Sequence, residues 1–388
     1  MSFKSLREAD LYQKSVLVRV DFNVPVDEKG EISEDFKIRK TLPLIQYLKD
    51  KKIKRLILIS HFGQPKSSRQ KKKFSLKPIA GILGKILKEK IYFFPEPIGD
   101  KLEKKIKKLE KGEICLLENI RYYRGEEKND SSFAKKISQL GDLYINEAFS
   151  VSHRKSASLV ALTRYLPSYP GFLFEEEIKN LNRLLKNPKA PLVVIMGGAK
   201  VKDKLPLLKK FLLISDYVLV GGVIANTILK AWDFEIGKSV YEKESVSLAK
   251  KIGSQKAELI LPGDFKVLKG KIVKTKELGN LGRQDIIFDI GENTINYYEK
   301  IILKAKTIFW NGPMGKIENK NFSQGTERII KAILKNKKAF TVIGGGETLV
   351  SFKGRFLESS HLFFSTGGGA ALSYLAGKSL PGISALNK

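Results

Sequence analysis

Charged and polar side chains follow several apolar runs in the first half of the chain. These side chains belong to Asp21, Asn23, Arg39, His61, Arg121 and Arg154. Arginine binds phosphate and carboxylate groups through paired hydrogen bonds, and aspartate and asparagine can bind hydroxyl groups. Taken singly, each arginine is more often a surface residue and each histidine an ordinary loop residue. Together they predict a site for a small phosphorylated acid, in which no histidine is assigned as a general base.

Lysines and glycine clusters take the same place in the second half. Residues 196–204 read Met-Gly-Gly-Ala-Lys-Val-Lys-Asp-Lys after an apolar run, and Lys200 and Lys204 lie four residues apart where we expect a helix to begin. Glycine triplets at 344–346 and 367–369 each close another apolar run. Free backbone N–H groups in such turns can bind phosphate oxygens. The two lysines alone would be interpreted as solvated side chains, but the repeated glycines favour a site for phosphate oxygens.

Common nucleotide and metal motifs are incomplete. Gly377-Lys378-Ser379 has the ending of a P-loop, but Leu372 stands where that motif needs its first glycine. Leu349 and Leu372 break the Gly-x-Gly-x-x-Gly pattern after the two triplets. The sequence contains neither the His-Arg-Asp nor the Asp-Phe-Gly motif of protein kinases, and no Cys/His cluster for zinc.

Short apolar runs alternate with longer amphipathic stretches. Strands are expected at residues 16–20, 55–60, 114–117, 142–146, 192–196, 217–220, 258–261, 307–310, 340–343 and 362–365, and helices at 76–90, 132–139, 174–185, 202–213 and 324–334. This alternation is typical of parallel sheets covered on both faces. The predicted fold class is α/β, with two Rossmann-like domains, each a parallel β-sheet covered by helices, and a cleft and hinge between them.

The length of 388 residues suggests two domains. Residues 165–171, Tyr-Leu-Pro-Ser-Tyr-Pro-Gly, end the first half, so we expect domains at 1–170 and 171–379, with the long helix as connector. The apolar stretch at 211–229 is interrupted by Asp216 and a glycine pair, and residues 1–14 have no apolar signal-peptide core. We therefore expect a cytoplasmic protein without a membrane partner.

The net charge of +30 invites a nucleic-acid hypothesis, but the lysines are spread along amphipathic segments. The one tight run, residues 71–73, is expected in a surface loop. Nucleic acid is thus not predicted as the primary partner. Cys115 lies in an apolar run and is expected to be a buried, inert thiol.

The chain resembles the phosphoglycerate kinases over residues 16–386. The shared motifs are Arg-Val-Asp-Phe-Asn-Val-Pro, His-Phe-Gly-Gln-Pro, Glu-Asn-Ile-Arg-Tyr, Gly-Gly-Ala-Lys-Val-Lys-Asp-Lys, Trp-Asn-Gly-Pro-Met-Gly, Gly-Gly-Gly-Glu-Thr and Ser-Thr-Gly-Gly-Gly-Ala. The resemblance implies a glycolytic enzyme and a two-lobed monomer whose N-terminal domain binds 3-phosphoglycerate or 1,3-bisphosphoglycerate. The C-terminal domain would bind ADP or ATP with Mg²⁺, the domains would close to react, and residues 380–388 would return to the N-terminal domain.

The resemblance also implies roles for single residues. The substrate would be held by Asp21, Phe22, Asn23, Arg39, His61, Phe62, Gly63, Gln64, Arg121 and Arg154. The moving phosphoryl group would face Arg39, Lys200, Gly367 and Gly368. The nucleotide would be bordered by Lys204, Gly291, Glu318, Gly345, Gly346, Glu347 and Thr348, with Glu347 also the ligand of Mg²⁺.

Four positions depart from the family pattern. Gln64 replaces an arginine, Lys155-Ser156 replaces Ala-His, Val223 replaces a small residue, and Glu347 replaces aspartate. We expect the departure at Gln64 to affect substrate affinity and the departure at Glu347 to affect metal binding. Together with the net charge, these departures motivate the alternative that the chain keeps the phosphoglycerate kinase fold with weakened activity and acts as a binding or interaction protein.

Overall fold

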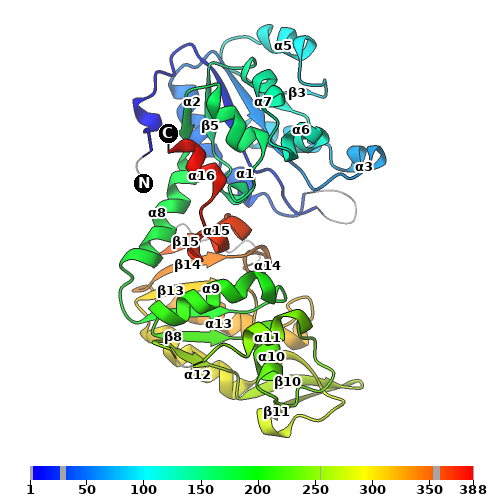
Figure 1. Cartoon of the computed structure of the whole chain (residues 1–388), viewed down its shortest axis with the longest axis vertical. Coiled ribbons are helices and arrows are strands. Elements are labelled where there is room, and N and C mark those ends of the chain that lie inside the picture. Colours follow the sequence, from blue (N-terminus) through cyan, green and yellow to red (C-terminus); the bar gives the residue numbers. More distant parts are fainter. Residues whose placement is uncertain (1–2, 27–31, 254, 353–358, 388) are drawn as a thin grey trace. The chain divides into compact units, whose positions relative to one another are not determined.

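The computed structural model describes residues 3–26, 32–253, 255–352 and 359–387. The chain divides into two compact units (Figure 1). Unit 1 consists of Met1–Ile178 and Ser379–Lys388, and unit 2 of Lys179–Lys378. Each unit has its own six-stranded sheet.

The sheet of unit 1 has the strand order β3-β4-β2-β1-β5-β6, and every pair of neighbours is parallel. Its strands are β1 (Ser15–Arg19), β2 (Arg55–Ile59), β3 (Ile91–Phe94), β4 (Glu113–Leu117), β5 (Leu143–Asn146) and β6 (Ser168–Pro170). The central strands are buried on both faces, which explains why the sequence shows them as continuous apolar runs.

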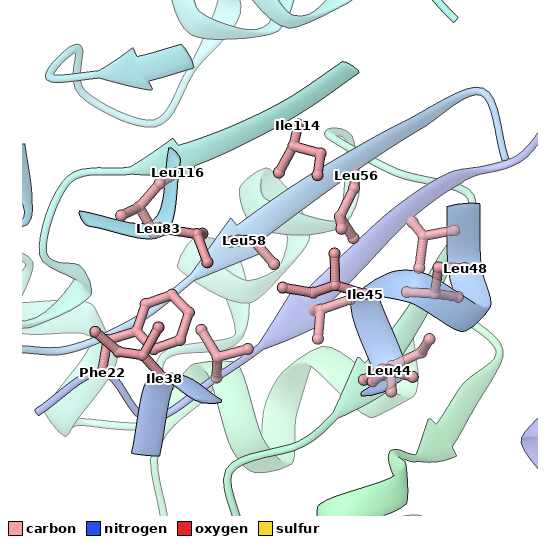
Figure 2. Close-up of a cluster of buried hydrophobic side chains, with 14 of the residues drawn as sticks. Phe22, Ile38, Leu44, Ile45, Leu48, Leu56, Leu58, Leu83, Ile114 and Leu116 are labelled. Carbon is pink, nitrogen blue, oxygen red and sulfur yellow. The ribbon is translucent and has the colours of Figure 1, made fainter. Parts of the chain in front are cut away.

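Helices cover both faces of this sheet. The helices of unit 1 are α1 (Phe36–Arg39), α2 (Leu42–Asp50), α3 (Ser68–Lys73), α4 (Lys77–Leu87), α5 (Asp100–Lys107), α6 (Arg124–Glu127), α7 (Ser131–Ser138), the first part of α8 (Phe172–Lys186), and α16 (Pro381–Leu386). On one face, Leu56 and Leu58 of β2 belong to the same buried cluster as Ile45 of α2 and Leu83 of α4 (Figure 2). The alternate residues of β2, including Ile57, join α5 and α7 in a cluster on the other face.

Unit 2 has a second all-parallel sheet, in the order β15-β14-β13-β7-β8-β9. Its strands are β7 (Leu192–Met196), β8 (Tyr217–Val220), β9 (Glu258–Ile260), β13 (Thr307–Asn311), β14 (Phe340–Gly344) and β15 (Leu362–Phe364). Its helices are the end of α8, α9 (Val201–Ile214), α10 (Gly222–Ala231), α11 (Val246–Ala249), α12 (Glu292–Lys304), α13 (Gln324–Lys335), α14 (Gly346–Ser351) and α15 (Gly368–Leu375). Phe211 of α9 packs on Phe309 of β13, with ring centroids 5.1 Å apart.

A smaller antiparallel sheet in unit 2 was not expected from the sequence. It has the order β11-β10-β12, formed by β10 (Asp264–Lys269), β11 (Ile272–Glu277) and β12 (Ile286–Ile290). Its strand β11 is largely exposed and rich in charged residues, so it leaves no apolar run to detect. Phe265, Val267 and Ile287 nevertheless form a buried cluster with Leu229 of α10.

The predicted α/β fold class is confirmed, and each expected strand is present to within one residue at its ends. The helix expected at 76–90 ends earlier, because Lys88 takes a left-handed conformation (φ 56°) as the C-cap of α4. Residues 71–73 were expected in a loop, but they belong to α3, since lysine is a good helix former. The edge strands β3 and β6 were also missed, because they are short and only partly buried.

Cys115 is a free, buried cysteine on β4, as expected, and burial raises the pKa of its thiol. No helix among the described residues is long and apolar enough to cross a membrane.

Two adjacent leucines of α9 provide a test of this packing. Leu212 is fully buried, whereas Leu213 is 57% exposed. We expect Leu212→Ala to lower the free energy of unfolding of unit 2 by about 2–5 kcal/mol, because the buried site is left with a cavity. The matched control Leu213→Ala should change it by less than about 1 kcal/mol. Chemical denaturation followed by circular dichroism measures both, and equal losses would contradict the orientation of α9.

Candidate active site

Neighbouring strands of unit 1 place charged residues at one edge of the sheet. Strands β4, β2, β1 and β5 are adjacent and parallel, so the loops that follow them lie at the same edge. These loops carry Arg121, His61, Asp21 and Arg154, in that strand order. The structure therefore brings together residues that are far apart in the sequence.

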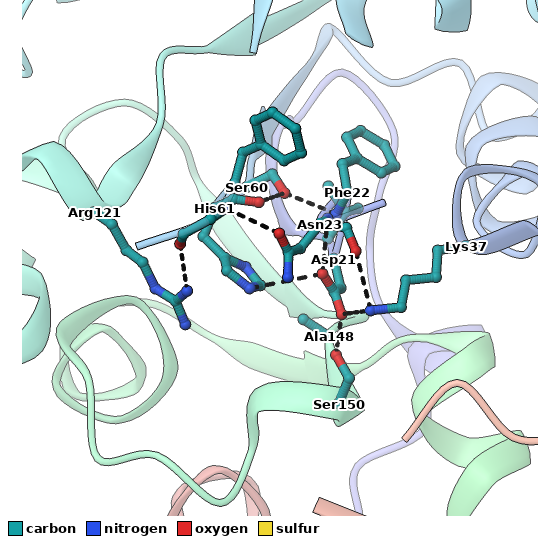
Figure 3. Close-up of polar contacts among 12 residues, drawn as sticks. Asp21, Phe22, Asn23, Lys37, Ser60, His61, Arg121, Ala148 and Ser150 are labelled. Atoms are coloured by element: carbon teal, nitrogen blue, oxygen red, sulfur yellow. Dashed lines mark hydrogen bonds and ion pairs between the residues drawn. The ribbon is translucent and has the colours of Figure 1, made fainter. Parts of the chain in front are cut away.

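Asp21 is the central acceptor of this group (Figure 3). Lys37 donates to Asp21 Oδ2 at 2.7 Å, the hydroxyl of Ser150 donates to the same oxygen, and the backbone N–H of Asn23 donates to Oδ1 at 2.9 Å. Burial of Asp21 opposes its charge, but the attraction of Lys37 and these hydrogen bonds outweigh it. The pKa of the carboxyl is therefore held well below its usual range, and Asp21 is a buried anion.

His61 lies between Asp21 and a buried arginine. Its Nε2 is 3.7 Å from Asp21 Oδ1, and its Nδ1 is 3.2 Å from the guanidinium of Arg19. Because arginine can only donate, Nδ1 must accept, which places the ring proton on Nε2. Burial and the nearby cations Arg19, Arg121 and Lys37 lower the pKa of His61 well below its ordinary value, although Asp21 opposes them. His61 is thus a neutral hydrogen-bond donor on the side of Asp21.

The loop after β2 is held by several side chains of the site. The Asn23 side-chain oxygen accepts from the Gly63 N–H at 2.9 Å, and Arg121 donates to the Gly63 carbonyl at 2.7 Å. Gly63 has φ +57°, and a Cβ there would lie 2.3 Å from the ring of Phe74. Both the conformation and the space therefore require glycine. Gln64, which follows, is exposed.

The side chains of two residues predicted to bind substrate lie in the core. The side chains of Phe22 and Phe62 are buried in the cluster between the sheet, α2 and α4. The Phe22 N–H donates to Ser60, and the Phe62 carbonyl accepts from Asn119 at 2.6 Å. These phenylalanines fix the positions of their loops, and their side chains are not available to a ligand.

The basic residues of unit 1 differ in their surroundings. Arg121 is half-buried, and burial, together with Arg19 and Arg154, lowers its pKa to about 10. Arg154 is exposed but close enough to Arg121 to act on it. Arg39 is exposed and donates to Asp35, with Nε 2.9 Å and Nη2 2.8 Å from the carboxylate oxygens. The structure does not bring Arg39 to Asp21.

Three residues of this cluster were not predicted from the sequence: Lys37, Ser150 and Arg19. Lys37 stands two residues before Arg39 in the same stretch, and Arg19 opens the motif that contains Asp21. Arg19 lies within the strand expected at 16–20, where it is almost fully buried and donates to Ser158 and to the Val20 carbonyl. A charged residue inside an apolar run was the available signal, because such a residue needs buried partners.

In unit 2, glycines allow the loops at the sheet edge to touch backbone to backbone. The Gly198 N–H donates to the Pro313 carbonyl at 2.8 Å, and the Gly222 N–H to the Met314 carbonyl at 2.9 Å. A Cβ on Gly312 would lie 2.1 Å from the Gly197 carbonyl oxygen. These N–H groups are therefore used between loops, and the glycines permit close packing more than they provide free donors.

The two lysines after β7 occupy different environments. Lys200 is the exposed N-cap of α9, whereas Lys204 is buried and donates to the Gly197 carbonyl at 2.6 Å. Burial lowers the pKa of Lys204 to about 8, Glu347 opposes this, and Lys200 adds to it. Lys200, Lys204 and the exposed Glu347 thus lie near one another at the carboxyl edge of the sheet.

A cavity of about 330 Å³ opens beside these residues. Its apolar lining includes Val223, Phe265, Phe288 and Met314, and Glu318 and Glu347 border it as well. An apolar pocket of this size with a few polar groups suits a flat organic ring such as a nucleobase.

Other predicted nucleotide residues have structural roles. Gly291 is absent from this lining and packs on Asp264, whose carboxylate accepts from the first turn of α12. Thr348 is buried, and its hydroxyl accepts from the Gly312 N–H at 2.6 Å. Gly345 (φ +95°) and Gly367 are the N-caps of α14 and α15, followed by Gly346 and Gly368 as their first residues.

The contacts of His61 predict its protonation state. Long-range ¹⁵N–¹H NMR should show the ring proton on Nε2 and an unprotonated Nδ1 throughout about pH 6 to 8, because burial and Arg19 disfavour the cation. A titration midpoint near 6.5, or a proton on Nδ1, would contradict the Arg19–His61 contact.

Comparisons with known proteins agree over the whole chain. A family model described as phosphoglycerate kinase matches residues 6–378. The phosphoglycerate kinase of Coprothermobacter proteolyticus is 42% identical over 392 residues, covering 100% of this chain and 99% of the relative. That of Borrelia hermsii is 40% identical over 396 residues, covering 100% of both.

Solved phosphoglycerate kinase structures also match. The one from Coxiella burnetii has a TM-score of 0.84 at 36% identity, with 100% of this chain and 99% of that chain covered, and the one from Pyrococcus horikoshii a TM-score of 0.86 at 32% identity, with 99% and 98% covered. The chain belongs to the phosphoglycerate kinase family.

Proposed function

We propose that this chain catalyses the reversible transfer of the acyl phosphate of 1,3-bisphosphoglycerate to ADP, giving 3-phosphoglycerate and ATP in glycolysis. The observation that carries the proposal is the coincidence of family membership with two chemically distinct sites. One is a cluster of cations around a buried aspartate in unit 1. The other is an apolar cavity beside two lysines in unit 2.

In unit 1, we assign the glycerate to the edge formed by Asp21, Asn23 and His61. Asp21 is ionised and His61 Nε2 carries a proton, so the pair offers an acceptor and a donor to a substrate hydroxyl or carboxylate. Arg121 and Arg154 repel one another, which favours an anion beside them, and the phosphate of the substrate supplies that charge. The exposed Gln64 would contribute only a neutral contact.

In unit 2, the cavity would hold the adenosine, with Glu318 at its border. Lys204 would bind nucleotide phosphates, and the exposed Lys200 would stabilise the moving phosphoryl group. Gly367 and Gly368, at the start of α15, would offer backbone N–H groups to that phosphoryl group. In phosphoryl transfer the protein contributes mainly positioning and charge stabilisation, which is what these groups can supply.

Magnesium fits this site as a companion of the nucleotide. Within the residues that the structure describes, no group of three or more His, Cys, Asp or Glu side chains could hold a metal ion. Mg²⁺ commonly takes one or two protein carboxylates and completes its shell with phosphates and water. Glu347 is exposed at the start of α14 and borders the cavity, so we propose it as that carboxylate. The ion would neutralise phosphate charge.

We further propose that unit 1 is the phosphoglycerate-binding domain, unit 2 the nucleotide-binding domain, and the enzyme a cytoplasmic monomer. Light scattering after size-exclusion chromatography tests whether the protein is a monomer.

A coupled assay with 3-phosphoglycerate, ATP and magnesium tests the activity. Turnover would exclude the alternative of a non-catalytic binding protein, which the comparisons do not favour. Absence of turnover would refute the proposed function.

Lys200 should act mainly in the transition state. We expect Lys200→Ala to lower kcat by about two to three orders of magnitude with a modest change in KM, because a single charge-stabilising donor has effects of that size. Steady-state kinetics in both directions measures this. Loss of nucleotide affinity at unchanged kcat would assign Lys200 to ground-state binding.

The charge of the chain should make substrate binding sensitive to salt. The KM for 3-phosphoglycerate should rise with ionic strength, since the screening length is about 10 Å at 0.1 M. Gln64→Arg should lower KM and steepen the salt dependence, because it adds a cation beside Gly63. A KM that stays constant between low and physiological salt, in both proteins, would mean that the surplus lysines lie far from the site.

A further inference from the structure

Helix α9 starts with a lysine as its N-cap residue, which is unfavourable for a helix. An N-cap side chain usually accepts a hydrogen bond from the first helical turn, but the ammonium group of Lys200 can only donate. Its positive charge also lies at the positive end of the helix dipole. In addition, Pro206 inside α9 has no N–H group, so the usual helical bond to the Lys202 carbonyl cannot form. The first turn of α9 therefore needs support from outside the helix.

Glu242 provides this support from a segment that is distant in the sequence. It stands 40 residues after Lys202, and its Oε2 accepts from the Lys202 N–H at 2.6 Å. The hydroxyl of Ser245 donates to the same oxygen and holds the carboxylate in place. Glu242 thus supplies what Lys200 cannot, because it brings both an acceptor and a negative charge to the start of α9.

The backbone of Glu242 is in turn bound to α10. The Glu242 N–H donates to the hydroxyl of the buried Thr227 at 3.0 Å, and that hydroxyl donates to the Val223 carbonyl at 2.7 Å. Val223 lines the cavity that we assign to the adenosine. A continuous series of hydrogen bonds therefore runs from the cavity wall through Glu242 to the first turn of α9, next to Lys200.

We propose that Glu242 is a positioning residue, which fixes the start of α9 so that Lys200 meets the moving phosphoryl group. Lys200 adjoins the turn that Glu242 holds, so a displacement of that turn moves a charge that must be aligned in the transition state. Glu242 acts through Lys200 and needs no contact with a ligand. This inference rests on the proposed function and adds a residue that lies outside the sequence motifs of the site.

A double-mutant cycle tests whether Glu242 acts through Lys200. The kcat and the KM values for 3-phosphoglycerate and ATP are measured for the wild type, Glu242→Ala, Lys200→Ala and the double variant, and thermal melting verifies the fold of each. The matched control is Glu244→Ala. The Glu244 carboxylate is 81% exposed and lies 3.9 Å from the ammonium group of Lys202, so it removes a negative charge beside the same turn while the bond from Glu242 to the backbone remains.

We expect Glu242→Ala to lower kcat by about ten- to a hundredfold, because the charge of Lys200 is then misplaced. The KM for 3-phosphoglycerate should change by less than about threefold, since that substrate is assigned to unit 1. In the Lys200→Ala background, the same substitution should lower kcat by less than about threefold. Glu242→Gln keeps an oxygen acceptor for the Lys202 N–H and should recover most of the lost activity, whereas Glu244→Ala should resemble the wild type.

Two results would overturn the proposal. The first is an equal fold-loss of kcat from Glu242→Ala in the wild-type and Lys200→Ala backgrounds, which would make Glu242 a structural residue independent of Lys200. The second is a Glu242→Ala protein with the kinetics of Glu244→Ala. Should Glu242→Ala fail to fold, Glu242→Asp takes its place in the cycle, because it keeps the charge but withdraws the acceptor by one methylene group.

The same measurements separate this inference from the proposed function. A wild type that lacks turnover would refute the proposed function, and the positioning role of Glu242 with it. Either of the two overturning results in an active wild type would refute the role of Glu242 alone.

Discussion

Parallel pairing of adjacent strands is the constraint on which both candidate sites depend. In each unit the central strands are buried on both faces and run in the same direction, so every loop that can carry polar groups emerges at one of two edges. In unit 1 the carboxyl edge collects Asp21, His61, Arg121 and Arg154. The apolar clusters on the two faces of the sheet hold the strands from which these loops emerge.

Burying charge at that edge has a consequence for every neighbouring group. Asp21 is almost excluded from water, and it stays ionised because the Lys37 ammonium group and the Ser150 hydroxyl bind its carboxylate. The same burial keeps His61 neutral, and Arg19 on its other nitrogen fixes the position of the ring proton. The donors and acceptors at this edge are thus fixed by the buried contacts among the residues themselves.

In unit 2, glycine residues allow the loops at the sheet edge to pack closely against one another. The loops after β7, β8 and β13 approach so closely that a side chain on Gly197 or Gly312 would overlap a neighbouring carbonyl group. This contact places Lys204 beneath the loops, where burial lowers its pKa, and leaves Lys200 and Glu347 exposed above the edge. The small antiparallel sheet adds Phe265, Ile287 and Phe288 to the cavity, so an element with little sequence signal forms one of its walls.

The sequence by itself determined the fold class, most strands of the two parallel sheets, and the place of the polar groups after them. Apolar runs of strand length next to Asp21, His61 and Lys200 were sufficient for this, because burial on two faces leaves an unmistakable pattern. Tertiary structure decided which members of each group meet. It placed Lys37 on Asp21 and Arg39 on Asp35, buried the side chains of Phe22, Phe62 and Thr348, and built a cavity wall from residues of β10 and β12 in the unexpected antiparallel sheet. These outcomes depend on the direction in which a side chain leaves a short helix or loop and on partners distant in the sequence, and neither is encoded in local spacing.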